Sequence, residues 1–167
     1  MKTLYLVRHA KSSHDIPFLD DVMRGLSDRG KADAKLIGQY LNETNAVISK
    51  IYSSHSVRTK ATLAILNTYL HIQDTAISYH EDLYTFDDNG EIFLQYGQKT
   101  DEGLDTILLL SHNYSCAQFA IRISKDRIIS YPTCSVLKCT WDVDSWSDVK
   151  MDNVTEVSMM TPKQLKG

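Results

Sequence analysis

The sequence predicts an α/β protein of three layers, α/β/α, in which helices cover both faces of a mostly parallel central sheet that ends in antiparallel C-terminal strands. Three apolar segments each lead into a polar loop and then a helical stretch, the alternation typical of parallel strands joined by helices. The last third alternates apolar and polar residues instead, as antiparallel strands do. The chain has 167 residues and 43% hydrophobic content, so we expect residues 1–167 to form a single domain.

The first of these units opens the chain. Residues 3–7 are a short apolar run rich in strand-forming residues, and a polar cluster follows at residues 8–14. Ser27 is placed to cap a helix that reaches about residue 41. One face of this helix carries apolar residues at helical spacing: Ala34, Ile37 and Leu41.

Two further units follow the same pattern. Residues 47–52 predict a second strand, followed by Ser53, Ser54 and a helix that begins near His55. The face predicted to be buried in that helix consists of Val57, Ala61, Ala64, Ile65 and Thr68. Residues 106–110 are a continuous aliphatic run, as in a central parallel strand that is covered on both faces, and a helix over residues 115–123 follows.

The C-terminal third predicts two antiparallel strands. Leu137, Cys139, Trp141 and Val143 alternate with polar residues, and residues 155–159 do so more loosely. The two strands would be joined around residues 145–147.

Composition and motifs exclude several classes of function. The formal charge is −3, from 18 Lys and Arg against 21 Asp and Glu, which does not fit the basic surface of a nucleic-acid-binding protein. No apolar run approaches the roughly 18 residues of a membrane helix, and no signal-peptide core is present, so we expect a cytoplasmic protein that binds no membrane. The three cysteines form no C-x-x-C pair and are interpreted as buried apolar residues.

Histidine and arginine residues follow the predicted strands at their carboxyl ends. These ends meet at one rim of an α/β sheet, where ligands bind. They would bring together Arg8, His9, Arg58 and His112. The sequence has no histidine pair at metal-ligand spacing and no glycine-rich phosphate loop, so neither a metal nor a nucleotide cofactor is expected.

This set of residues suits the handling of a phosphoryl group. The guanidinium groups of Arg8 and Arg58 match phosphate oxygens. His9 as a neutral imidazole could attack phosphorus, and His112 could stabilise the charge of the transition state. Histidines at strand ends are also often only structural, and residue type and spacing alone leave both interpretations open.

A resemblance to a known family adds to this interpretation. Residues 4–12, LYLVRHAKS, resemble the R-H-G opening of the histidine phosphatase superfamily, the phosphoglycerate-mutase-like proteins, in the R-H-A-K-S form of its small SixA-like phosphohistidine phosphatase branch. Five further blocks resemble family segments in the same order along the chain: residues 24–30, 53–63, 81–84, 109–114 and 132–135. The sequence departs from the family pattern at four positions: Ala10 for Gly, and Gly25, His55 and Tyr114 for Pro.

The resemblance implies a phosphoglycerate-mutase-like fold, a single catalytic domain and a phosphatase that needs no cofactor or metal. It implies that His9 is the nucleophile and that Arg8, Arg58 and His112 complete the phosphate pocket. It also nominates Glu81 as the acid that protonates the leaving group, although Asp82, Asp87, Asp88 and Glu91 lie nearby in sequence. The remaining candidate substrate contacts are Lys11, Ser12, Arg24 and Asn113. Lys11 and Ser12 could instead simply cap the loop.

The short chain bears on the expected substrate. Larger members of the family carry insertions that enclose a small substrate, and residues 69–106 leave little length for such a lid. An open pocket favours phosphohistidine on a protein as the substrate. The alternatives are a phosphatase for small phosphoesters or phosphosugars and a noncatalytic phosphate-binding interaction protein.

Overall fold

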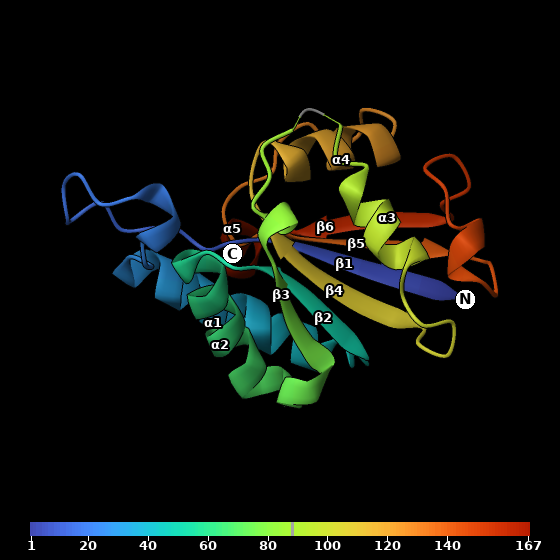
Figure 1. Cartoon of the computed structure of the whole chain (residues 1–167), viewed down its shortest axis with the longest axis horizontal. Helices are drawn as coiled ribbons and strands as arrows, with labels where there is room; N and C mark the ends of the chain where they lie inside the picture. Colours follow the sequence, from blue (N-terminus) through green and yellow to red (C-terminus); the bar gives the residue numbers. More distant parts are fainter. Residues whose placement is uncertain (88) are drawn as a thin grey trace.

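The computed structural model of the chain describes residues 1–87 and 89–167, and within them six strands form one sheet in the order β3-β2-β4-β1-β5-β6 (Figure 1). The strands are β1 (Lys2–Arg8), β2 (Lys50–Ser54), β3 (Ile77–His80), β4 (Thr106–Ser111), β5 (Val136–Trp141) and β6 (Glu156–Met160). The first four strands pair in parallel, whereas β5 is antiparallel to both of its neighbours, β1 and β6. This confirms the predicted sheet.

Helices cover both faces of this sheet (Figure 1). They are α1 (Asp28–Glu43), α2 (Val57–Leu70), α3 (Ile92–Gln98), α4 (Ser115–Ile123) and α5 (Pro162–Leu165), with four short 3-10 turns, η1 (Asp21–Met23), η2 (Asp74–Ala76), η3 (Glu81–Leu83) and η4 (Trp146–Asp148). Helices α1 and α2 pack on one face, and α3 and α4 pack on the other. The three-layer α/β/α architecture is therefore confirmed.

The central strands show why two separate cores form. Leu4 and Leu6 of β1 face the α3 and α4 layer, while Tyr5 and Val7 face the α1 and α2 layer. Alternate residues of a strand point to opposite faces, so a continuous apolar run is what a strand covered on both sides requires. Full burial of each such side chain contributes roughly 1.5–3 kcal/mol, which fixes the strands whose ends carry the polar residues.

Helix boundaries follow the sequence signals closely, with one exception in packing. The Ser27 side chain accepts a hydrogen bond from the Gly30 amide at 3.1 Å and caps α1 as predicted. The predicted buried face of α2 is wrong. Its buried residues are Arg58, Thr59, Thr62, Leu63 and Leu66.

Polar residues on the buried face of α2 explain this error. The Thr62 hydroxyl accepts a hydrogen bond from the Ala10 amide at 3.0 Å, and the Thr59 hydroxyl donates to the Ser54 carbonyl at 2.8 Å. The threonines of this face contact the strand ends while Leu63 and Leu66 pack in the core, so apolar spacing alone points to the wrong side. The second strand also begins later than predicted, at Lys50.

The segment between α2 and β4 contains elements that the sequence did not predict. It supplies β3, an edge strand, and α3, which covers the sheet face that α4 shares. This length is thus used for the sheet and its outer layer. The three cysteines are buried and free, as predicted.

In the part of the chain that the structure describes, none of the helices has the length and apolar character to span a bilayer.

Candidate active site

A polar cavity of about 260 Å³ opens where β1 and β4 end. The two strands are in register to their last residues, so Arg8 lies opposite Ser111, and His9 and His112 follow directly. The first turn of α2 adds Arg58. The lining residues are Arg8, His9, Lys11, Ser12, His14, Asp21, Arg58, Phe86, Asn113 and Thr133.

His9 is held as a neutral imidazole with one nitrogen free. Its Nδ1 lies 2.7 Å from the Ala10 carbonyl oxygen, which can only accept a hydrogen bond, so Nδ1 carries the proton and Nε2 carries the lone pair. Burial, reinforced by the nearby charges of Arg58 and Arg8, lowers the pKa of His9 to about 4. At neutral pH the Nε2 atom is therefore an available nucleophile.

His112 is fixed in the opposite tautomer. Its Nδ1 accepts from Arg58 Nη2 at 3.1 Å, because a guanidinium can only donate, and its Nε2 then donates to the Ser54 hydroxyl at 2.8 Å. Burial, then His9 and Arg58, lower the pKa of His112 to about 2. The two imidazole centroids are 5.2 Å apart. His9 lines the cavity, whereas His112 is fully buried and is not one of the lining residues.

The two arginines of the pocket differ in burial and in how many of their N–H donors already have a hydrogen-bond partner. Arg8 Nη1 donates to the Tyr131 carbonyl at 2.7 Å, while its buried Nε has no hydrogen-bond partner among the described residues. Arg58 is only 4% exposed. Burial lowers the pKa of Arg8, but a guanidinium stays charged at any working pH. The buried Arg58 and the half-buried Arg8, which has a spare donor, form a site for an anion.

Asp21 and Phe86 line the pocket although sequence reasoning singled out neither, and Asp21 is the charged one of the two. Arg58 donates to its carbonyl oxygen at 2.7 Å and to its carboxylate at 2.9 Å, and the Tyr84 hydroxyl donates to the same carboxylate oxygen. Partial burial opposes ionisation, but the hydrogen bonds from Tyr84 and Arg58 outweigh it and keep the pKa of Asp21 below its usual value. The carboxylate is therefore ionised at neutral pH.

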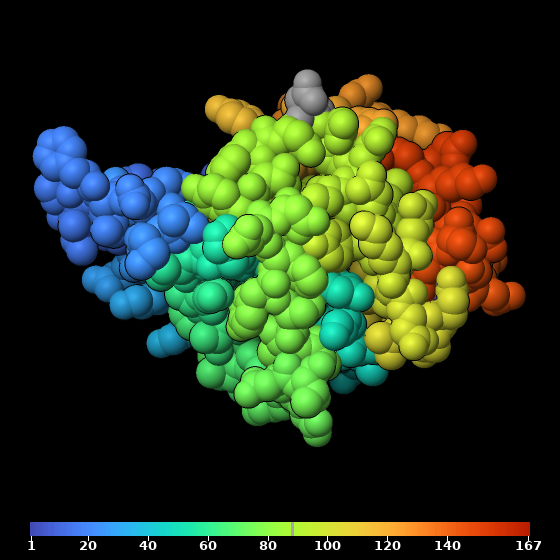
Figure 2. All heavy atoms as spheres, viewed as in Figure 1, coloured from blue at the N-terminus to red at the C-terminus, as the bar shows by residue number. Residues whose placement is uncertain are grey.

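No local signal marks Asp21 in the sequence. It belongs to η1 in the irregular segment between β1 and α1, which projects from the body of the molecule and is blue at the left of Figures 1 and 2. The contact with Arg58 joins residues 37 positions apart. Only the fold brings this carboxylate to the arginine.

The structure brings most of the other predicted residues to the cavity. Lys11, Ser12 and Asn113 line it. Asn113 Oδ1 accepts from the Ala117 amide at 3.2 Å, which leaves its amide nitrogen to donate. Arg24 and Glu81 do not line it. Arg24 donates to the Ile16 carbonyl at 3.2 Å, and Glu81 is an exposed residue at the start of η3.

No group of three or more His, Cys, Asp or Glu residues could hold a metal ion within residues 1–87 and 89–167.

Comparison with known families decides the assignment. The family model for the histidine phosphatase superfamily (branch 1) matches residues 4–87, about half of the chain, and this match includes His9 and Arg58. The chain belongs to the histidine phosphatase superfamily. It is accordingly a hydrolase of the phosphatase type. No curated protein sequence matches the chain.

Solved structures share the fold of this family member. The protein histidine phosphatase SixA complexed with tungstate aligns with TM-score 0.80 and 20% identity, over 98% of this chain and 99% of that one. A SixA from Agrobacterium tumefaciens, described as a candidate phosphohistidine phosphatase, aligns with TM-score 0.73 and 24% identity, over 84% and 92%. A mycobacterial glucosyl-3-phosphoglycerate phosphatase aligns with TM-score 0.60 and 11% identity, over 96% and 98%.

Proposed function

We propose that this histidine phosphatase superfamily member hydrolyses phosphohistidine on a protein through a covalent intermediate at His9, with residues 1–167 acting as one catalytic domain. The observation that carries the proposal is the free Nε2 of His9, held neutral by burial beside two arginines. A bond forms from Nε2 to phosphorus while the bond from phosphorus to the leaving group breaks. Water then attacks the phosphoenzyme, which releases inorganic phosphate and restores neutral His9.

Phosphate binding would rearrange the ion pairs of the pocket. In the structure the Asp21 carboxylate pairs with the Arg58 guanidinium at 2.9 Å. A phosphoryl dianion carries more negative charge, and Arg8 offers it a buried Nε without another partner among the described residues. We infer that the phosphate displaces the Asp21 carboxylate from Arg58 and that the Asn113 amide and Lys11 add further donors. The tungstate bound by the SixA structure is a tetrahedral oxyanion of the same charge type.

His112 would change protonation state during this cycle. Its neutral Nδ1 accepts a hydrogen bond from Arg58 in the structure. A bound dianion offsets the charge of the arginines, so it favours a protonated His112 that donates to the phosphoryl oxygens, while His9 remains the neutral nucleophile. This places His112 among the groups that stabilise the transition state.

The leaving group supports phosphohistidine as the substrate. When its other ring nitrogen is protonated, the imidazole of phosphohistidine leaves as a neutral ring whose conjugate acid has a pKa of about 6.5. Such a leaving group needs no acid at the atom bonded to phosphorus, whereas an alkoxide needs a proton donor positioned there. The pocket's own carboxyl, Asp21, is ionised, and Glu81, the acid that the resemblance nominates, is exposed. Such a site suits substrates whose leaving group needs no strong acid.

The size of the cavity points in the same direction. Its volume of about 260 Å³ lies below the roughly 300–1,000 Å³ typical of sites that enclose a whole small ligand. It therefore holds a phosphoryl group and leaves the rest of the substrate outside, where a protein surface would lie.

A phosphoenzyme trap tests the mechanism. Rapid quenching with a labelled phosphohistidine peptide should yield a base-stable, acid-labile phosphoenzyme in the wild type and none in His9→Ala or His9→Asn, with turnover reduced by about 1,000-fold or more. Melting temperatures of the two variants control for folding. Full activity of a folded His9→Asn variant would exclude His9 as the nucleophile, and binding of phosphopeptide without turnover by the wild type would favour a noncatalytic interaction protein.

Substrate choice needs a separate comparison. We expect kcat/KM for a phosphohistidine protein to exceed that for a panel of phosphosugars and other small phosphoesters. A preference for a sugar phosphate would instead support the small-phosphoester alternative and reject the protein substrate.

A further inference from the structure

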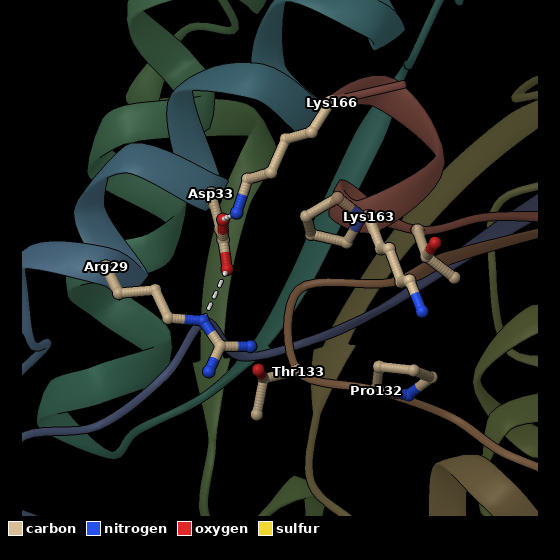
Figure 3. Close-up of a pocket in the computed structure, with 8 residues that line it drawn as sticks. Arg29, Asp33, Pro132, Thr133, Lys163 and Lys166 are labelled. Carbon is tan, nitrogen blue, oxygen red and sulfur yellow. Dashed lines mark ion pairs between the residues drawn. The ribbon is translucent and has the colours of Figure 1, made fainter.

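A second cavity, of about 230 Å³, lies next to the catalytic one and is lined by basic side chains (Figure 3). Arg29 comes from the first turn of α1, and Lys163 and Lys166 come from the C-terminal α5 and its cap. Asp33 is the acidic residue among them. Three cations therefore face one carboxylate, which leaves two net positive charges at the cavity.

The Asp33 carboxylate fixes two of these cations. Its side chain is 1% exposed, and it pairs with Lys166 Nζ at 2.7 Å and with Arg29 Nε at 3.6 Å. The pair with Lys166 fastens α5 to α1. The pair with Arg29 uses Nε alone, so both terminal nitrogens of that guanidinium remain available as a fork of donors.

Fastening α5 does not explain the whole cavity. The Lys163 ammonium has no ion-pair or hydrogen-bond partner among the described residues, and neither do the terminal nitrogens of Arg29. In Figure 3 both groups extend toward the turn that holds Pro132 and Thr133, while Asp33 lies between Arg29 and Lys166. Arg29 ends beside Thr133 and Lys163 extends toward Pro132, so the two positive groups line the same cavity from different sides and make it suitable for an anion.

Thr133 connects this cavity to the catalytic pocket, since it lines both. A ligand that fills only the catalytic pocket does not reach Arg29 or Lys163, whereas a polypeptide crossing the Thr133 turn does. We propose that the second cavity binds an acidic side chain of the protein substrate, close to its phosphorylated residue. This inference rests on the proposed function, because it assigns the same active site a substrate specificity.

The exposure of the basic groups favours a carboxylate on a larger partner over a free anion. Arg29 and Lys166 are 68% and 50% exposed, so water competes for any small ion there and each contact is weak. A carboxylate that is tethered to a substrate already held in the catalytic pocket binds at a high effective concentration. A weak subsite is therefore useful only for a substrate that spans both cavities.

The test uses a set of phosphohistidine peptides in which one glutamate is moved through the positions flanking the phosphorylated residue, with a glutamine at the same position as the control. The wild type should prefer the glutamate peptide at one or two positions, through a lower KM rather than a higher kcat. Lys163→Gln, which leaves both Asp33 pairs intact, should reduce that preference by about three- to fivefold, and Lys163→Glu should abolish it. Arg29→Gln should act in the same direction.

Two controls separate the subsite from catalysis and from folding. Turnover of p-nitrophenyl phosphate should be unchanged in each variant, because that substrate reaches only the catalytic pocket. Lys35→Gln removes an exposed lysine from the same helix as Arg29 but outside the cavity, and it should leave the peptide preference intact.

The possible failures are distinguishable. If the wild type hydrolyses every peptide equally well, or if Lys163→Glu keeps the preference, the acidic subsite is wrong while the phosphohistidine phosphatase stands. If the wild type hydrolyses no phosphohistidine peptide yet turns over p-nitrophenyl phosphate, the proposed substrate and the subsite are both overturned.

Discussion

The ion pairs of the two cavities differ in which partner is buried, the cation or the carboxylate. In the catalytic pocket the cation is buried and the carboxylate is exposed: the side chain of Arg58 is 5% exposed and that of Asp21 is 58% exposed. In the second cavity the carboxylate is buried and the cations are exposed, with Asp33 at 1%, Lys166 at 50% and Arg29 at 68%. In each cavity one charged partner is buried and the opposite charge is exposed to solvent.

This difference indicates which charge each cavity can offer a ligand. A buried charged group is held in place by packing. Separating it from its partner costs free energy, because no water replaces the lost contact. An exposed partner exchanges at little cost. The catalytic pocket can therefore exchange the Asp21 carboxylate for a phosphate, while the second cavity keeps Asp33 and offers its cations to a carboxylate from outside.

Exchange of the buried cation is expected to have the largest effect. Arg58→Lys keeps the charge but loses the planar fork that contacts Asp21 and His112, so we expect kcat/KM for p-nitrophenyl phosphate to fall on the order of 100-fold. Arg29→Lys is the matched control in the second cavity and should change this activity less than about twofold. Equal losses in both variants would contradict the distinction between a fixed and an exposed cation.

Removal of the buried carboxylate should affect stability rather than catalysis. Asp33→Asn loses the charge that holds Lys166 and Arg29, and we expect the free energy of unfolding to fall by about 1–2 kcal/mol, with little change in turnover of p-nitrophenyl phosphate. For a chain of this length each kcal/mol lowers the melting temperature by roughly 2–4 °C. Thermal and urea unfolding measure the effect.

Asp21→Asn provides the contrast, because its carboxylate is exposed and its loss should leave the melting temperature almost unchanged. A larger destabilisation by Asp21→Asn than by Asp33→Asn would reverse the roles that we assign to the two carboxylates.

The sequence was sufficient to locate those site residues that directly follow a clearly apolar strand. Arg8 and His9 follow an apolar strand directly, and His112 follows another, so locating the strands was enough to place them at one rim. The fold class followed for the same reason, because β1 and β4 each contain a continuous apolar run, at residues 4–7 and 107–110. The face of α2 was misjudged because its inward threonines bind strand ends instead of packing in the core.

The missing parts depend on contacts between distant segments. Edge strand β3 has four residues, none of them fully buried, and so shows no clear apolar pattern. Asp21 reaches Arg58 from an irregular loop, and Lys166 reaches Asp33 from the far end of the chain. Neither ion pair corresponds to a periodic pattern or a fixed spacing in the sequence. The charged residues of each cavity could therefore be grouped only from the tertiary structure.

The smallest expected effect tests whether the exposed carboxylate of the catalytic pocket is exchangeable. If a bound oxyanion displaces Asp21 from Arg58, Asp21→Asn removes a competitor, and tungstate should inhibit the variant about two- to fivefold more tightly. Glu81→Gln, a carboxyl outside the cavity lining, should leave tungstate inhibition unchanged. If Glu81 is the acid, the Glu81→Gln variant should hydrolyse alkyl phosphates more slowly than the wild type, with a smaller effect on phosphohistidine peptides, because the alkoxide leaving group needs the proton. Tungstate inhibition that weakens in Asp21→Asn would show that the carboxylate supports the bound anion, and Asp21 would then be a fixed part of the site in the way that Asp33 is.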